Sequence, residues 1–227
     1  MTELTFLGTG NFLAPPGRYW NSFVMDGSVL VEPAPTALPH LARCGLMVEQ
    51  IEVVVVSHFH ADHCFGWPFL LLAVAEAGAG RTVHVVGPPG IEAHLANMNE
   101  AGAVRTVTEL GYTNLDLRFV EVEHVPYLRC FGYLFDRGGQ VVAYSGDTTP
   151  CPGLSELARE AEVLVVECNG RHTPPGVPST HMDEDGVRAL QAAHPDVHLV
   201  LTHLGEQVDT ASMAGVTVPD DFERLTV

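Results

Sequence analysis

Four potential metal ligands stand within six positions of the segment "SHFHADHCFG", namely His58, His60, Asp62 and His63. Imidazole and carboxylate are the usual ligands of zinc in proteins, and they also suit manganese and iron. In an extended segment residues i and i+2 point the same way, so His58 and His60 can contact one ion. Asp62 and His63 come after a turn and can face a second ion. The segment therefore predicts a metal site with two ions.

Two more potential ligands follow apolar runs elsewhere in the chain. The run "VVAYSGDT" ends in Asp147 and "HLVLTH" ends in His203, just as "VVVVSH" ends in His58. In layered α/β folds, sites form in the crevice beyond the carboxyl ends of the strands, so we expect these residues to meet there. Two ions about 3.5–4 Å apart can hold a hydroxide between them. They can then stabilise both the attacking and the leaving oxygen when a group at phosphorus is displaced.

The elements that must position these residues alternate between strands and helices. Asp26-Gly27 supplies a positive-φ turn between two apolar runs, and Gly45 is a plausible helix C-cap. The alternation favours two sheets packed together with helices outside, in one domain over residues 1–227. Strands are predicted at 4–10, 21–33 (a hairpin), 51–58, 82–87, 115–124, 130–135, 140–147, 162–168 and 197–203, and helices at 36–44, 67–78, 89–101, 153–160 and 183–193.

The charge balance argues against large anionic partners. Eleven basic residues, all arginine, face 28 acidic ones, which gives a formal charge of -17. Such a surface repels nucleic-acid backbones and anionic lipid, so we expect neither long nucleic acid nor a membrane as a partner. The apolar segment "GWPFLLLAV" predicts a core helix, and the alternative is that it forms half of a homodimer contact.

The compartment expected from the sequence is the cytoplasm. The start "MTELTFLGTG" enters a strand-like segment without a basic region followed by an apolar one, and no apolar run reaches roughly 18 residues. The five cysteines are odd in number and never form a C-x-x-C pair. Scattered cysteines of this kind are typical of reduced thiols, most of them small core residues.

The ligand pattern resembles a known family. "HFHADH" is similar to the H-x-H-x-D-H signature of the metallo-β-lactamase superfamily, whose fold is a four-layer αβ/βα sandwich of two mixed β-sheets. "FLGTG" and "NSFVMDGSVLVEP" resemble the opening strands of its ribonuclease Z and phosphodiesterase branch. His124, before a Gly-Tyr strand, resembles the third-motif histidine of that branch, Asp147 its bridging aspartate and His203 its last ligand.

The resemblance implies a role for each of these residues. Asp147 would bridge two divalent ions, zinc foremost, with manganese or iron as alternatives. Asp62 and His181 would be the catalytic residues, and His181 would contact the substrate or aid the leaving group; alternatively, His181 caps the following helix. The first ion would be held by His58, His60 and His124, and the second by Asp62, His63 and His203.

One segment departs from the family pattern. The second strand of the hairpin usually ends in an acidic "D-x-G" segment, whereas here it ends in "VEPAP". Glu32 either orients a ligand histidine in place of that aspartate or is a solvated strand end. Cys64 follows His63 directly, but the resemblance assigns no metal to it, so we expect a buried neighbour.

The stretch "CNGRHTPPGVPSTH", residues 168–181, is rich in glycine and proline between a strand and a helix. A loop there would project over the site, which makes Asn169, Arg171, His172 and His181 candidates for contacting substrate. The alternative is a loop that only covers the end of the sheet.

The function expected from the sequence is a dinuclear metal-dependent hydrolase, a phosphodiesterase that attacks a small substrate with a metal-bridging hydroxide. A hydrolase of lactones, thioesters or sulfate esters is the main alternative. A ribonuclease Z-like enzyme is disfavoured because 125–146 hold only two predicted strands and a turn, with no room for a transfer-RNA-binding arm. A flavodiiron-like electron carrier is disfavoured by His60, and a binding module with a vestigial site by the filled ligand positions.

Overall fold

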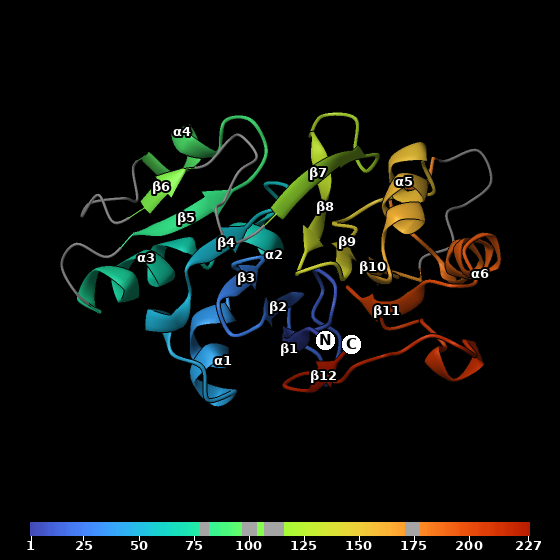
Figure 1. Ribbon diagram of the computed structural model, residues 1–227, viewed down its shortest axis with the longest axis horizontal. Coiled ribbons are helices and arrows are strands. Elements are labelled where there is room, and N and C mark those ends of the chain that lie inside the picture. The colour runs from blue at the N-terminus through green and yellow to red at the C-terminus, as the bar shows by residue number, and fades with distance from the viewer. Residues whose placement is uncertain (78–81, 97–103, 107–115, 171–177) are drawn as a thin grey trace.

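The chain forms two mixed β-sheets, as the computed structural model in Figure 1 shows for residues 1–77, 82–96, 104–106, 116–170 and 178–227. Within these residues, the first sheet has seven strands in the order β12-β1-β2-β3-β4-β5-β6 and the second has five in the order β11-β10-β9-β8-β7. The strands are β1 (Glu3–Gly8), β2 (Ser22–Met25), β3 (Val29–Val31), β4 (Val53–Val55), β5 (Val83–Val86), β6 (Val104–Thr106), β7 (Asp116–Val122), β8 (Cys130–Asp136), β9 (Val141–Tyr144), β10 (Val163–Glu167), β11 (His198–Thr202) and β12 (Arg224–Thr226).

Both sheets combine parallel with antiparallel pairs, which confirms the predicted mixed architecture. In the first sheet β1 to β3 and β12 pair antiparallel, whereas β3 to β6 run parallel. In the second sheet β7 to β9 are antiparallel and β9 to β11 are parallel. The helices are α1 (Ala37–Arg43), α2 (Ala61–Cys64), α3 (Trp67–Glu76), α4 (Ile91–Ala96), α5 (Pro152–Glu160) and α6 (Glu184–Ala193), with short 3₁₀ turns η1 (Val48–Gln50) and η2 (Thr210–Ser212).

Three clusters of buried apolar side chains hold four layers together. One cluster joins the outer face of the first sheet to α1 and α3, and includes Val54 and Trp67. A second joins the other sheet to α5 and α6, and includes Leu157. The third lies between the sheets, where Phe23 of β2 packs edge-on against Tyr144 of β9 with ring centroids 5.5 Å apart. Figure 1 shows the resulting order of helices, sheet, sheet and helices.

The predicted hairpin turn is confirmed in detail. Asp26 and Gly27 both have positive φ, 48° and 68°, as the central residues of a turn of this handedness require, and Ser28 N donates to the carbonyl oxygen of Met25 at 3.1 Å. The turn sets the register of β2 on β3, in which Met25 pairs with Val29. This pairing fixes where β3 ends, and therefore where the following Glu32 lies.

Several predicted boundaries differ from the structure. β4 is limited to Val53–Val55, although its three residues are buried as predicted for a strand covered on both faces. The predicted helix 89–101 is α4 over Ile91–Ala96, and residues 97–101 lie outside the described part of the chain. β6 and β12 were not predicted, because three residues are too few to show a period-2 pattern.

Helix α3 buries one face and exposes the other. Trp67, Leu70 and Val74 lie in the core, whereas Phe69 and Leu72 are exposed. The segment is therefore a core helix as predicted, with an apolar stripe left on its outer side. No helix among the described residues has the length and hydropathy needed to cross a bilayer.

Candidate metal centre

The predicted ligands follow strands of both sheets. The parallel strands β9 and β11 end at one edge of the second sheet, and β4 of the first sheet ends beside that edge. Helix α2 continues directly from the segment after β4. His58 and His60 follow β4, Asp62 and His63 lie in α2, His124 follows β7, Asp147 follows β9, and His203 follows β11.

Two backbone positions at these strand ends have positive φ. Gly146 precedes Asp147 with φ 61°, and a Cβ there would lie 2.7 Å from the carbonyl oxygen of Phe131 and 2.9 Å from Cβ of Ser57. Only glycine fits that close approach. His203 adopts φ 52°, a conformation that is uncommon for a residue with a Cβ and that clusters at functional sites.

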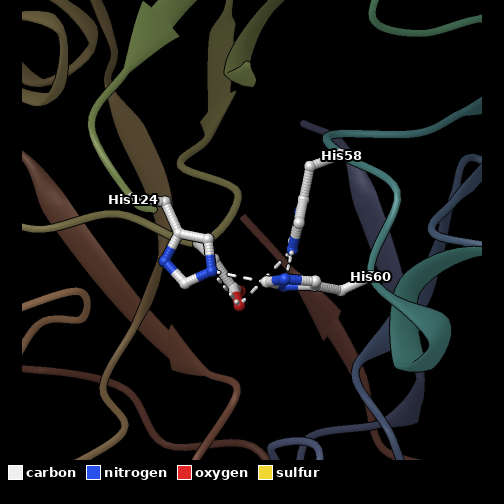
Figure 2. A group of neighbouring side chains, drawn as sticks. His58, His60 and His124 are labelled. Atoms are coloured by element: carbon white, nitrogen blue, oxygen red, sulfur yellow. Dashed lines mark hydrogen bonds and ion pairs between the residues drawn. The ribbon is translucent and has the colours of Figure 1, made fainter. Parts of the chain in front are cut away.

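His58, His60 and His124, labelled in Figure 2, point toward one another and form a first group with Asp147. His58 Nε2 lies 2.9 Å from His60 Nδ1, and His124 Nε2 lies 3.3 Å from the same atom. Asp147 Oδ2 is 3.8 Å from His58 Nε2 and 3.9 Å from His124 Nε2. Two ligand atoms that share a tetrahedral zinc lie roughly 3.4 Å apart. The spacing of this group therefore fits one ion.

Asp62, His63 and His203 form a second group. Asp62 Oδ2 lies 3.3 Å from His63 Nε2 and 3.4 Å from His203 Nε2. Asp147 also faces this group, with Oδ1 3.3 Å from His63 Nε2 and Oδ2 3.5 Å from His203 Nε2. Asp147 therefore lies between the two groups, in the place where the sequence predicts a bridging aspartate.

The buried atoms of the second group fit a cation. His63 Nε2 and Asp147 Oδ1 face each other at 3.3 Å, are buried and make no hydrogen bond within the described structure. Buried polar groups normally have partners, so such atoms require an explanation. Asp147, Glu32 and Glu167 are all at most 2% exposed, and clustered buried carboxylates need positive charge nearby. A divalent ion satisfies both requirements.

The ring orientation of His124 is fixed by a hydrogen bond. Its Nδ1 lies 2.5 Å from the carbonyl oxygen of Thr180, which can only accept, so Nδ1 carries the proton. Nε2 then presents its lone pair to His60 and Asp147. Ligand histidines usually have such a bond on the ring nitrogen that faces away from the metal.

The electrostatics of the first group favour the protonation states that metal ligands need. Burial lowers the pKa of His58, His60 and His124, so these imidazoles are neutral at pH 7. Burial alone would raise the pKa of Asp147, but His203 and His63 hold it well below its ordinary value.

In the second group, positive charge collects on two histidines. Burial lowers the pKa of His203, but Asp147 and Asp62 outweigh burial and raise it to about 10. The pKa of His63 is raised for the same reason. The ionised carboxylates thus keep these two histidines protonated, and their positive charge stands where a bound cation would otherwise supply it.

Glu32 faces a ligand rather than solvent. It is fully buried, and both carboxylate oxygens lie 3.2 Å from the backbone nitrogen of Ser57, which donates to them. Its Oε1 lies 3.4 Å from His63 Nδ1, the ring nitrogen opposite the one that faces the aspartates. Of the two alternatives for this position, the structure matches the one in which Glu32 orients a histidine.

His181 is paired with Glu167, a residue that the sequence reading did not single out. His181 Nδ1 lies 2.8 Å from Glu167 Oε1, which also accepts from the backbone nitrogen of Thr148 at 2.7 Å. Burial lowers the pKa of His181, but Glu167 outweighs it and raises the value. The helix-capping alternative is not observed, because the side chain of Asp183 caps α6. The signal for Glu167 was its place at the end of β10, between β9 and β11.

Of the remaining predicted substrate contacts, Asn169, Arg171 and His172, the structure describes only Asn169. The buried side chain of Asn169 accepts a hydrogen bond from Asn11 Nδ2 at 2.7 Å, and Asn169 does not line the cavity described below. Arg171 and His172 lie outside the described residues. Their role in substrate binding stays a prediction. Cys64 is buried, as expected, and belongs to neither ligand group.

A cavity of about 480 Å³ opens beside the metal-ligand groups. Sequence reasoning missed its apolar wall, because aromatic residues in loops show no periodicity. Among the described residues, the lining consists of Phe12, Trp20, Pro35, His60, Ala61, Asp62, Phe65, His124, Val125, Asp147, Thr180 and His181.

Comparison with known proteins agrees with this geometry. Residues 27–204 match the family model described as the beta-lactamase superfamily domain. The chain belongs to the metallo-β-lactamase superfamily. The ribonuclease Z of Mycobacterium marinum is 27% identical over 194 residues, which cover 73% of this chain and 70% of that protein.

Two solved structures show the same fold. The metallo-β-lactamase fold protein YhfI from Bacillus subtilis has a TM-score of 0.84 at 17% identity, over 99% of this chain and 98% of that one. A diphosphatase from the PhnP family has a TM-score of 0.80 at 20% identity, over 100% and 98%. The chain is a metal-dependent hydrolase of the ribonuclease Z and PhnP-like branch.

Proposed function

We propose that this protein is a dinuclear metal-dependent phosphodiesterase that hydrolyses a small phosphodiester. The observation that carries the proposal is the pair of ligand groups on either side of Asp147, both next to one cavity. The first ion is assigned to His58, His60 and His124, and the second to Asp62, His63 and His203. Zinc suits this donor set best, and manganese or iron are alternatives.

The chemistry that two bound ions supply is neutralisation of the phosphoryl oxygens and activation of water near neutral pH. The residues of the chain orient the substrate and move protons. Asp62 lines the cavity with its carboxylate ionised, because His63 and His203 outweigh burial and lower its pKa. We assign it the acceptance of a proton from the attacking water. His181, with Nδ1 held by Glu167, would donate from Nε2 to the leaving oxygen.

A small substrate fits the cavity and the charge of the chain. A volume of about 480 Å³ suits a small molecule, and a net charge of -17 opposes a long polyanion. Residues 125–146 contain β8, β9 and their short connections, which leaves no long arm between His124 and Asp147. We therefore propose a small-molecule substrate, without long nucleic acid or a membrane as a partner.

A ribonuclease Z-like activity is the second candidate, because curated relatives with that name match most of the chain. The same ligand set could also serve lactones, thioesters or sulfate esters. For the compartment we propose the cytoplasm, since all five cysteines are unpaired in the structure.

The test is hydrolysis of bis(p-nitrophenyl) phosphate by protein loaded with zinc or manganese, with bound metal measured on the same sample. We expect metal-dependent turnover that falls at least a hundredfold in His124→Ala. His198→Ala is the matched control, because His198 is exposed and bonds Thr217, outside both ligand groups. Full metal content without turnover would reject the phosphodiesterase, and cleavage of precursor transfer RNA would favour the second candidate.

A further inference from the structure

The lining of the cavity beside the metal centre divides by chemistry into two sets of residues, which we call its two sides. One side consists of His60, Asp62, His124, Asp147 and His181, the reacting groups of the proposed function. The other side is built from Phe12 and Trp20 between β1 and β2, Pro35 after β3, Phe65 after α2 and Val125 after β7. A substrate that fills the cavity therefore contacts both the reacting groups and these apolar side chains.

The second side offers little to a polar substrate. Apart from the reacting side, the described lining contains one polar side chain, that of Thr180, and no arginine. The chain has no lysine at all. Sugar hydroxyls or a second phosphate would lose their bonds to water there without finding replacements, which disfavours binding. Apolar atoms would gain from leaving water on the same surface.

Hydrogen bonds to backbone carbonyl oxygens tie the three aromatic residues to neighbouring segments. Trp20 Nε1 donates to the carbonyl oxygen of Phe12 at 3.0 Å, so the two residues are fixed to each other. Phe65 caps the end of α2, where its backbone nitrogen donates to Ala61 at 3.0 Å. The next residue, Gly66, donates to the carbonyl oxygen of Pro33 at 2.9 Å. Phe65 is thereby tied both to the ligand segment and to the loop that carries Pro35.

These side chains are also more exposed than a purely structural role requires. Phe12 is 46% exposed and Phe65 is 57% exposed. They stand on different loops, yet they line the same cavity. Apolar residues that converge on a cavity with reactive polar groups are the usual composition of a small-molecule site.

We propose that the substrate is a phosphodiester with one uncharged aromatic or branched aliphatic ester group, and that Phe12, Trp20 and Phe65 bind this group. The inference rests on the proposed function for the phosphodiester itself. Nucleotides and sugar phosphates are expected to be poorer substrates, because the described lining outside the reacting groups holds Thr180 as its one polar side chain. The three aromatic residues set the specificity, whereas the histidines and aspartates carry the reaction.

The test keeps the leaving group constant and varies the other ester group. The substrates are p-nitrophenyl phosphodiesters whose second group is phenyl, methyl, thymidine 5′ or choline. All four release p-nitrophenolate, so differences in kcat/KM report on the second group. We expect the phenyl ester to exceed the methyl and thymidine esters at least tenfold. Equal rates, or a preference for thymidine or for the cationic choline ester, would overturn the inference and leave the phosphodiesterase intact.

Two matched variants test whether Phe65 binds the phenyl group of the substrate. Phe65→Ala is expected to raise KM for the phenyl ester about tenfold while KM for the methyl ester stays within twofold. Phe69→Ala is the control, because Phe69 is exposed on α3 and does not line the cavity. Equal effects of the two variants would contradict the assignment of Phe65.

Binding measurements distinguish a missing apolar subsite from a missing phosphodiesterase activity. Phenylphosphonate and methylphosphonate are titrated into metal-loaded wild-type protein and the Phe65→Ala variant by calorimetry. One outcome is that no phosphodiester is hydrolysed, yet phenylphosphonate binds wild-type protein at least tenfold more tightly than methylphosphonate and loses this preference in Phe65→Ala. In that case the reaction assignment is wrong and the apolar subsite stands. Equal affinities would reject the subsite whatever the reaction.

Discussion

At the scale of single residues, Glu167 explains how a histidine beside a metal centre can act as an acid. Its carboxylate bonds His181 Nδ1 at 2.8 Å and holds the pKa of that imidazole above its ordinary value despite burial. A group with a raised pKa keeps its proton to higher pH. His181 can therefore still donate a proton to a leaving group at a pH where an unperturbed histidine has lost it.

Glu167→Gln should shift the pH profile of the metal-loaded enzyme. The amide keeps the shape but removes the charge that raises the pKa of His181, so the imidazole loses its proton at lower pH. We expect kcat/KM to fall roughly 10–100-fold at pH 7 and its alkaline limb to move to lower pH. Glu162→Gln, at an exposed position just before the same strand, is the control. A uniform loss with an unmoved limb would indicate a structural role only.

The cysteines give a second prediction at this scale. Burial raises the pKa of Cys130 and Cys168 to about 12, so almost no reactive thiolate exists at pH 8. Iodoacetamide should label at most Cys44 in the native protein, since Cys44 is the partly exposed one, and all five after denaturation. Mass spectrometry of the intact protein gives the count. Rapid native labelling of Cys168 would contradict the buried position.

Some site residues could be predicted from the sequence and others could not, for a physical reason. His58, His60, Asp62 and His63 are close in sequence, and their chemistry is specific enough to indicate a metal before any fold is known. Glu167 and the aromatic cavity wall gain their meaning only from neighbours far away in the chain. Trp20, for example, bonds Phe12 but shares a cavity with His181.

At the scale of elements, long strands and turns with glycine were predictable, and short edge strands were not. The β-branched run at β4 and the Asp26-Gly27 turn are local signals that need no partner. β12 depends entirely on pairing with β1, through contacts such as Leu4 with Leu225, which the sequence of β12 alone does not encode. Its alternation is only three residues long and mostly exposed.

Gly66, just before helix α3, gives a prediction at the scale of elements. Gly66 packs so closely against the loop after β3 that a Cβ would lie 2.0 Å from the carbonyl oxygen of Ala34. Gly66→Ala must displace that loop or the ligand segment before it, and should lower the free energy of unfolding by about 1–3 kcal/mol. Gly186→Ala within α6 is the control, because its nearest contact is the flexible end of Met182 and alanine favours helix; a change within about 1 kcal/mol is expected. Urea denaturation measures both, and equal effects would refute the packing argument.

At the scale of the whole molecule, the metal centre joins the two sheets. The ligands His58, His60, Asp62 and His63 follow β4 of the first sheet. The remaining ligands follow strands of the second sheet and are His124, Asp147 and His203. Between the sheets lies one apolar cluster without any disulfide among the described residues. Bound ions would therefore act as cross-links between two halves that otherwise hold together by packing.

Removal of metal should consequently lower the melting temperature of the whole chain. A ligand present at about 1,000 times its Kd stabilises the folded state by about 4.1 kcal/mol, which corresponds to roughly 8–16 °C for a chain of this size. Calorimetry before and after chelation, with metal content measured on each sample, gives the shift. His203→Ala should shrink the shift by removing a ligand from the second sheet, whereas His198→Ala should not. Complete metal loss at an unchanged melting temperature would show that packing alone joins the sheets.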